Sequence, residues 1–254
     1  MTEVIDPAVG PEAPEGKPQK GRRRVSFWIG LGLILAGLGI LAWLAWEIWG
    51  TTWISQREER HEVRVFESCR ATVCGGPPAL LEIPRFGSSY VVPINDGTSS
   101  DALSKGVGHF TGTGPGRTTI QAGQPGNYAL AGHRITHGQP FADLPNLVKG
   151  DLVYVITHKW AYKYELDTNA KDLNVSFTSG WVLGMDPVNP VAGGPQAIQT
   201  PYRCPGQSAV SAPCIITLTT CSELFHTDNR MIVFGHLVGR TATNPTNPTK
   251  IVGG

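Results

Sequence analysis

An uncharged segment of 22 residues, Val25 to Trp46, constrains this chain more than any other part of its sequence. A helix of that length rises about 33 Å, enough to cross the hydrocarbon core of a bilayer. Trp28 lies near one end of the segment and Trp49 near the other, where interfacial aromatic belts occur. Three arginines at 22–24 precede it, which places the N-terminus in the cytoplasm. We therefore predict one transmembrane helix at 25–49, with the larger C-terminal part outside the cell membrane.

The alternative is a cleaved signal peptide. Its apolar core would span about 7–15 residues and end at a small-residue cleavage site. The present segment is longer and runs on into Trp-Leu-Ala-Trp-Glu-Ile-Trp, which favours an uncleaved anchor. On its N-terminal side, the proline-spaced residues 1–24 predict a disordered cytoplasmic tail. On its C-terminal side, the mixed charges of 56–60 predict a solvated helical stalk or linker at 50–76.

Residues 77–240 read as a separate extracellular domain made of short strands. With 31 glycines and 20 prolines, the composition favours turn-rich β structure. No helical pattern longer than a turn or two interrupts the domain, so we predict an all-β antiparallel barrel or sandwich and favour a closed barrel. The strand candidates are 79–83, 90–94, 127–134, 152–157, 160–167, 181–183, 215–220 and 231–234. Residues 241–254 are predicted to be a flexible C-terminal tail, and the net charge of +1 gives no indication of nucleic-acid binding.

The five cysteines leave one thiol unpaired in an extracellular domain. Cys69 is close in sequence to Cys74, and Cys204 is close to Cys214, so two local disulfides with a free Cys221 are the simplest hypothesis. Four cysteines nevertheless allow three connectivities. A zinc site is the competing interpretation, but neither C-x-x-C spacing nor a clean histidine pair accompanies these cysteines.

Cys221 ends a run of β-branched residues, Ile215–Thr220, that predicts a buried strand. The eight residues 222–229 can return the chain as an antiparallel neighbour, so that Arg230 lies close to the cysteine. A guanidinium favours the thiolate and can stabilise negative charge that develops on a substrate. A cysteine at a strand end is more often a small buried apolar residue, so its neighbours decide the interpretation.

His133 ends another strand candidate, and a cysteine with a histidine is the minimal set for thiol acyl transfer. The cysteine attacks a carbonyl, the imidazole transfers protons, and Arg230 is suited to stabilise the oxyanion. Any single histidine is more often structural, and several others are available: His109, His137, His158, His226 and His236.

Several motifs taken together resemble the sortase family. Thr217-Leu218-Thr219-Thr220-Cys221 followed by Arg230 is similar to the family's T-L-x-T-C…R signature, and Ala131-Gly132-His133-Arg134 is similar to its histidine motif. Leu81-Glu82-Ile83-Pro84 and Gly150-Asp151 also lie where a sortase has them. The resemblance covers about residues 79–240 and is greatest to class E or class D housekeeping sortases of Gram-positive bacteria.

The resemblance implies a closed eight-stranded β-barrel and a cysteine transpeptidase. We expect no cofactor or metal, since the sequence has no acidic cluster that indicates a calcium site. Such an enzyme cleaves a C-terminal sorting signal of the Leu-Pro-x-Thr-Gly or Leu-Ala-x-Thr-Gly type between Thr and Gly. It then transfers the acyl group to an amine of the peptidoglycan precursor or to a pilin lysine. By position, Cys221 is the nucleophile, His133 the general acid and base, and Arg230 the substrate clamp and oxyanion stabiliser.

Thr220 and His137 are the expected substrate-binding residues, and His137 stands where class E relatives often have tyrosine. The long loop 187–213 lies where the family shapes the groove for the sorting signal. A pilus-polymerising sortase and a catalytically silent membrane-tethered binding domain are the alternatives. A papain-like protease is excluded, since the chain has no Cys-Gly-Ser-Cys-Trp sequence.

Overall fold

The computed structural model describes residues 20–68, 75–111, 120–194, 204, 213–221 and 228–243, with the backbone alone described at 20–24, Ile48 and Cys221. The chain divides into two compact units, Met1–Ala45 and Trp46–Gly254. Each unit is considered by itself.

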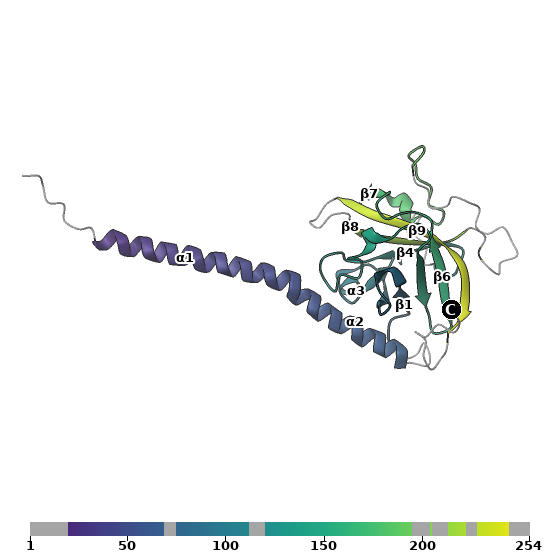
Figure 1. The fold of residues 1–254 in the computed structure, drawn as a ribbon, viewed down its shortest axis with the longest axis horizontal. Coiled ribbons are helices and arrows are strands. Elements are labelled where there is room, and N and C mark those ends of the chain that lie inside the picture. The colour runs from purple at the N-terminus through teal and green to yellow at the C-terminus, as the bar shows by residue number, and fades with distance from the viewer. Residues whose placement is uncertain are drawn as a thin grey trace, which may run out of the picture. The chain divides into compact units, whose positions relative to one another are not determined.

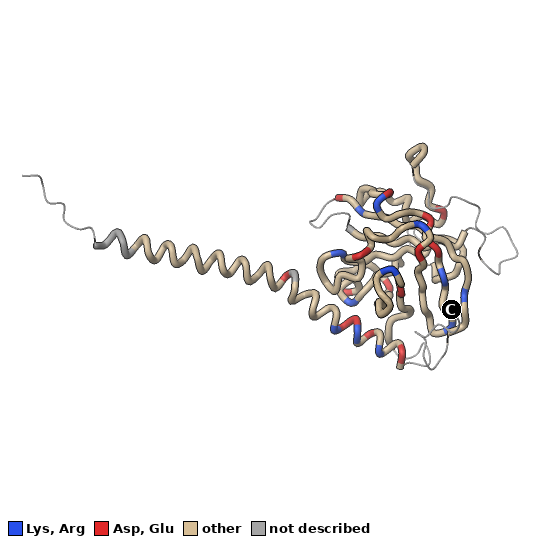
Figure 2. Tube along the Cα trace, viewed as in Figure 1, with Lys and Arg blue, Asp and Glu red and all other residues tan. Residues whose placement is uncertain are grey.

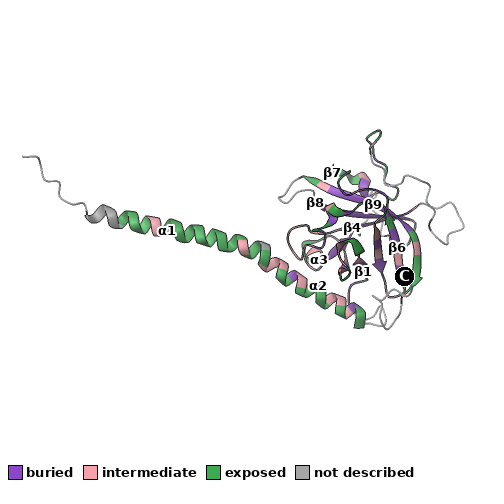
Figure 3. Cartoon of the chain, in the orientation of Figure 1, coloured by how far each residue is buried: buried purple, intermediate pink, exposed green. Residues whose placement is uncertain are grey.

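The first unit contains helix α1 (Lys20–Ala45). Its segment Val25–Ala45 has a mean hydropathy of 2.2, and none of its most apolar stretch is buried. Figure 2 shows no charged residue along this segment, and Figure 3 shows its surface almost entirely exposed. Among the described residues, α1 is the one helix long and apolar enough to cross a membrane, and by length and composition it fits a membrane anchor.

The second unit is a β-barrel with a helix packed on its outside (Figure 1). Its helical elements are η1 (Trp46–Gly50), α2 (Thr51–Ser68), η2 (Pro84–Phe86), α3 (Ser100–Ser104), η3 (Leu144–Asn146) and η4 (Gly180–Leu183). Its strands are β1 (Ala79–Glu82), β2 (Val91–Asp96), β3 (Val107–His109), β4 (Gly126–Ala131), β5 (Leu152–Ile156), β6 (Trp160–Leu166), β7 (Asn174–Ser176), β8 (Cys214–Cys221) and β9 (Asn229–Ala242).

Eight of these strands close into a barrel, as the sequence predicts. The order β6-β5-β1-β2-β3-β4-β8-β9 is closed by pairing of β6 with β9, and β7 adds a short ninth strand beside β9. The long β9 makes this closure possible, because its first half pairs with β8 and its second half with β6. No open edge remains among the eight strands.

The strand directions differ from the antiparallel expectation. β2 pairs with β3 in parallel, and β4 pairs with β8 in parallel, so the barrel is mixed. The short helix α3 connects β2 to β3 and returns the chain in the same direction. Strand patterning reports which residues face a core, but it carries no information about the direction of a partner that is distant in sequence.

The barrel interior is one apolar cluster drawn from every strand of the closed ring. Fully buried members include Leu81, Ile94, Leu130, Leu218 and Val233. Each such side chain contributes about 1.5–3 kcal/mol when it is removed from water. A rigid scaffold of this kind holds the strand ends in fixed positions.

A second cluster lies on the outer face of β4, β8 and β9. It joins Ala129, Ile215 and Phe234 to Val182 and Leu183 of η4. The sequence interpretation of 181–183 as a strand is wrong, because this segment is the 3-10 helix η4. The amide of Asn127 donates to the carbonyls of Val182 and Gly184, at 2.9 and 3.1 Å, so a tertiary contact holds the segment in this conformation.

Helix α2 packs one face against the barrel. Ser55, Glu59 and Phe66 are its buried residues. The ring of Phe66 stacks on that of His158 at 4.0 Å between centroids and joins a cluster with Leu80 and Ile156. Figure 3 shows α2 with buried and half-buried positions among exposed ones. The stalk at 50–76, which was expected to be solvated, therefore has one face that packs against the barrel. The predicted domain boundaries stay predictions.

Candidate active site

The parallel pair β4–β8 brings the predicted histidine beside the predicted nucleophile. Ala131 pairs with Thr219, and the backbone N–H of Gly132 donates to the carbonyl of Thr219 at 3.1 Å. His133 follows Ala131 by two residues, and Cys221 follows Thr219 by two residues. Continuing this register places His133 next to Cys221 at the carboxyl ends of the two strands.

The antiparallel pair β8–β9 places the predicted arginine opposite the nucleophile. Cys221 and Arg230 are direct partners in this register. Residues directly opposite one another in an antiparallel pair share a face of the sheet, with Cβ atoms about 4.5–5.5 Å apart. The hairpin geometry expected from the eight-residue loop therefore holds for the backbone.

Strand alternation puts positions 221 and 230 on the outer face of the barrel. Ile215 and Ile232 belong to the outer cluster. Positions 221 and 230 are an even number of residues from these two, respectively, so the period of two assigns them to the same face. His133 lies two residues beyond the end of β4, and helix η4 covers one part of the outer face.

The guanidinium of Arg230 is held by Phe177, which follows β7. The Arg230 Cζ lies 3.4 Å from the centre of the Phe177 ring, and Nη2 donates to the Phe177 carbonyl oxygen at 2.9 Å. The Phe177 side chain is 55% exposed although it is apolar. Sequence analysis did not identify Phe177, because its contact with Arg230 joins residues 53 positions apart.

Thr220 joins the two strand ends that carry His133 and Cys221. It is buried, and its hydroxyl donates to the carbonyl oxygen of Gly132 at 2.8 Å. The Thr220 side chain therefore fixes the relative position of β8 and the segment that follows β4. Its predicted contact with substrate stays a prediction.

His137 lies against His133. Their rings stack with centroids 4.8 Å apart and an interplanar angle of 28°. His137 has a left-handed backbone (φ 52°), and its Nδ1 lies 3.0 Å from the hydroxyl of Thr136. His137 is thus a neighbour of the candidate acid and base, and its expected role in binding substrate stays a prediction.

Most of the other histidines have structural partners. His109 is buried against the ring of Tyr128, and burial lowers its pKa. His158 stacks on Phe66, and His236 Nδ1 lies 2.9 Å from the Asp167 carboxylate. His226 is outside the described residues.

One of the two predicted disulfides is confirmed. Cys204 and Cys214 are bonded to each other and buried in the barrel core, so these two sulfurs are not zinc ligands. Cys69 and Cys74 lie outside the described residues. The Cys204–Cys214 bond ties part of the predicted groove loop 187–213 to the first residue of β8.

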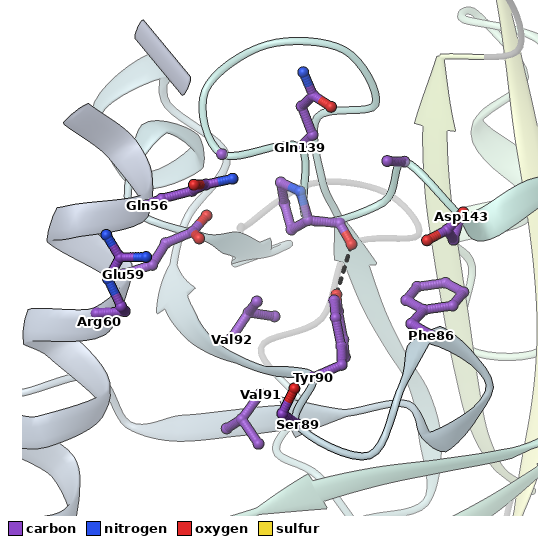
Figure 4. Close-up of a pocket in the computed structure, with 13 residues that line it drawn as sticks. Gln56, Glu59, Arg60, Phe86, Ser89, Tyr90, Val91, Val92, Gln139 and Asp143 are labelled. Carbon is purple, nitrogen blue, oxygen red and sulfur yellow. Dashed lines mark hydrogen bonds between the residues drawn. The ribbon is translucent and has the colours of Figure 1, made fainter. Parts of the chain in front are cut away.

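A cavity of about 360 Å³ lies between α2 and the turn that follows His137. Figure 4 shows Glu59, from α2, on one side of it and Gln139 above it, with the Tyr90 hydroxyl directed at the Pro140 carbonyl. Burial raises the pKa of Glu59 to about 7, and the charge of Arg60 opposes part of this rise. Sequence reasoning missed Glu59, although the spacing of Ser55, Glu59 and Phe66 on one helical face was a weak signal.

The backbone pairs the position of Cys221 with that of Arg230 and sets Thr219 beside Ala131, two residues before His133. A cysteine, a histidine and an arginine are residue types that can together perform acyl transfer. The thiol supplies the nucleophile, the imidazole transfers protons, and the guanidinium stabilises negative charge on a carbonyl oxygen.

Comparison with known proteins agrees with this chemistry. The family model for the sortase domain matches residues 81–238. Sortase SrtE1 of Streptomyces coelicolor is 36% identical over 176 residues, which are 68% of this chain and 44% of the relative. The match therefore spans less than half the length of SrtE1. Sortase SrtE2 of the same organism is 27% identical over 221 residues, 81% of this chain and 79% of the relative.

Solved structures give the same result. A crystal structure of sortase E1 from Streptomyces coelicolor with a tripeptide in the active site superposes with a TM-score of 0.50 at 30% identity, covering 68% of this chain and 94% of that one. The SrtF sortase of Corynebacterium diphtheriae has a TM-score of 0.52 at 25% identity, covering 69% of this chain and 91% of that one. The family model, the sequence relatives and the barrel agree, and the chain therefore belongs to the sortase family of cysteine transpeptidases.

Proposed function

We propose that this protein is a membrane-anchored sortase. It cleaves a sorting signal of the Leu-Pro-x-Thr-Gly or Leu-Ala-x-Thr-Gly type between Thr and Gly, and it transfers the threonyl group to an amine of the cell-wall precursor. The observation that supports this most directly is the strand register, which pairs position 221 with position 230 and pairs Thr219 with Ala131, two residues before His133.

The reaction proceeds in two balanced steps. The Cys221 thiolate attacks the threonyl carbonyl, the Thr–Gly C–N bond breaks, and the protonated His133 imidazole gives its proton to the leaving amine. The acyl group is then held as a thioester. The acceptor amine attacks this thioester, loses a proton to His133, and releases Cys221 as the thiolate.

Arg230 acts in both steps, because each passes through a tetrahedral oxyanion. A cation fixed near that oxygen stabilises the transition state more than the ground state. The contacts of Arg230 with Phe177 restrict the guanidinium before substrate arrives. Restricting it in advance lowers the entropy lost when it engages the oxyanion.

The anchor determines where this chemistry takes place. We propose that α1 spans the cell membrane once, with the arginines at 22–24 in the cytoplasm and the barrel outside. The substrates are then secreted proteins with a C-terminal sorting signal. Protease treatment of intact cells tests this topology, since only an external barrel would be digested.

The function is tested by peptide cleavage with the full chain in detergent micelles, using one peptide of each signal type. Cys221→Ala is expected to abolish cleavage, and His133→Ala and Arg230→Ala are each expected to reduce kcat/KM by at least about 100-fold. His61→Ala on the exposed side of α2 is the matched histidine control. Arg240→Ala is the matched arginine control, because Arg240 also lies on β9 over an aromatic ring, that of Trp160.

Two results would refute the proposal. Full cleavage by Cys221→Ala would exclude this nucleophile. If the folded wild-type chain cleaved neither peptide, the result would favour a catalytically silent binding domain. Mass spectrometry of the trapped intermediate gives an independent measurement, because the threonyl thioester adds the mass of the cleaved peptide to the chain.

A further inference from the structure

Glu59 is the one acidic residue of α2 that the barrel buries. It is 8% exposed, whereas the neighbouring Glu58 and Arg60 are exposed. Its Oε1 atom is buried and has no hydrogen-bond partner among the described residues. A buried carboxyl oxygen without a partner is costly, so its presence calls for a reason in the surrounding structure.

The Glu59 carboxyl packs directly against Gly138. A Cβ atom at Gly138 would lie 2.2 Å from Oε1 and 2.8 Å from Cδ of Glu59. Glycine is therefore required at this position for the carboxyl to approach. Gly138 also has φ +81°, a left-handed conformation that glycine adopts without strain.

The turn around Gly138 is strained. His137 (φ 52°) and Gln139 (φ 57°) flank Gly138, so three consecutive residues are left-handed and two of them carry side chains. Such conformations cost of order 1–3 kcal/mol each and persist only where the surrounding structure holds them. Within the turn, the Gln139 backbone N–H donates to the Thr136 carbonyl at 3.1 Å and its side-chain amide donates to the Ile135 carbonyl at 2.8 Å, and contacts from other elements add to these bonds.

Two external contacts hold this turn. The Tyr90 hydroxyl donates to the Pro140 carbonyl at 2.6 Å on one side, and Glu59 packs against Gly138 on the other. Between them lies the cavity of about 360 Å³, so the packing beneath the turn is otherwise loose (Figure 4). Burial, followed by the charges of Glu59 and Asp143, raises the pKa of Tyr90 well above its ordinary value and keeps its hydroxyl a donor.

The shape of the turn is transmitted to the candidate acid and base through ring stacking. His137 belongs to the turn, and its ring lies on that of His133. A displacement of Gly138 moves His137, and this stacking limits the positions that the His133 imidazole can take.

We propose that Glu59 is a positioning residue for the sortase reaction, holding the 137–139 turn and, through His137, the imidazole of His133. This inference rests on the proposed function for its kinetic consequence. Helix α2 then contributes to catalysis, in addition to connecting the barrel to α1.

The test uses the full chain in detergent micelles and a peptide containing Leu-Ala-x-Thr-Gly. Glu59→Ala is expected to lower kcat at least about 10-fold with less than a 2-fold change in KM, because the turn loses its contact while the peptide groove is unchanged. Glu59→Gln keeps the shape of the side chain and is expected to retain activity within about 3-fold at pH 6. Glu58→Ala, one residue away and exposed, is the matched control and should behave as wild type.

A double-mutant cycle tests the contact itself. Gly138→Ala should be strongly impaired, since its methyl group meets the Glu59 carboxyl. The same change made in Glu59→Ala should cause a loss at least about 5-fold smaller, because the methyl then has room. The strain of alanine at positive φ is present in both backgrounds and cancels.

The pH profile separates positioning from simple stability. The groups facing Glu59 are Arg60 on α2, Tyr90 before β2 and Asp143 after the turn. The kcat profile of the wild type should contain an inflection near pH 7 that Glu59→Gln removes and Glu58→Gln retains. A variant that is merely less stable would keep this inflection.

Nuclear magnetic resonance of the His133 imidazole makes the test independent of turnover. Its titration should shift in Glu59→Ala and stay as in wild type in Glu58→Ala, even where no peptide is cleaved. Three results would each overturn the inference. They are a His133 titration that is unchanged in Glu59→Ala, effects in the double-mutant cycle that are additive within 2-fold, and equal kinetics of Glu59→Ala and Glu58→Ala. Failure of the wild type to cleave peptide would instead refute the proposed function.

Discussion

The buried carboxyl of Glu59 predicts that Glu59→Gln changes how the stability of the catalytic unit depends on pH. Glu59 has a pKa of about 7 in the folded chain and an ordinary value of 4.5. Below pH 4.5 the carboxyl is protonated in both states and contributes no pH dependence. Between the two values the unfolded carboxyl ionises while the folded one does not, so the free energy of unfolding falls as the pH rises.

The size of this effect follows from the two pKa values. Their difference corresponds to at most about 3 kcal/mol, reached above pH 7 and constant beyond it. Glutamine has the same shape but does not ionise. The difference in free energy of unfolding, Glu59→Gln minus wild type, should therefore grow by up to about 3 kcal/mol between pH 4 and pH 8.5, which is roughly 6–12 °C in Tm for a domain of this size.

Thermal unfolding of the full chain in detergent, followed by near-ultraviolet circular dichroism across this pH range, measures the difference. Groups that titrate elsewhere in the chain are common to both proteins and cancel in it, and the Tyr90 hydroxyl keeps its proton throughout this range. Glu58→Gln is the control, because Glu58 is exposed and should give a flat difference. A Tm difference between Glu59→Gln and wild type that stays constant within about 1 °C from pH 4 to 8.5 would show that Glu59 is not desolvated as the structure indicates.

Three further predictions follow from single contacts. Thr220→Val should lower the free energy of unfolding by about 1–2 kcal/mol, since the buried Gly132 carbonyl loses its donor. Thr220→Ser keeps the hydroxyl and should not lower it, so equal urea midpoints for the two variants would contradict this prediction. Phe177→Ala and Phe177→Leu should both reduce kcat/KM by about 3- to 30-fold, because each removes the ring beneath Arg230, and unchanged kinetics would exclude a positioning role for that ring. Replacing Cys204 and Cys214 together with alanine should cost at least about 2–3 kcal/mol of stability, and reductant should lower the wild-type Tm by more than it lowers that of the variant.

Local sequence patterns were sufficient to predict those features of this protein that depend on residues close together in the sequence. The span Val25–Ala45 depends only on an uninterrupted apolar helix. The pairing of Cys221 with Arg230 depends on a hairpin across eight residues, and a closed barrel could be predicted from short strands and frequent turns. The family signature then indicated the chemistry.

Other features depended on partners that are distant in sequence. The parallel pairing of β4 with β8, the 3-10 conformation of η4 and the contact of Arg230 with Phe177 all join segments separated by 50 residues or more. Strand periodicity is the same for parallel and antiparallel partners. Residues 181–183 have a strand-like composition that the hydrogen bonds from Asn127 override.

Glu59 shows most clearly what sequence and tertiary structure each decide. The sequence alone determined an apolar helix long enough to cross a membrane, a stalk of mixed charge, and a cysteine, histidine and arginine in sortase order. In a mixed-charge helix every carboxyl has the same local reason to face water, so the sequence distinguishes Glu59 from Glu58 only weakly, by its spacing from Ser55 and Phe66. The folded barrel places Gly138, which is left-handed and has no Cβ, against one face of α2. Only this tertiary contact decided which carboxyl would be buried beside the 137–139 turn.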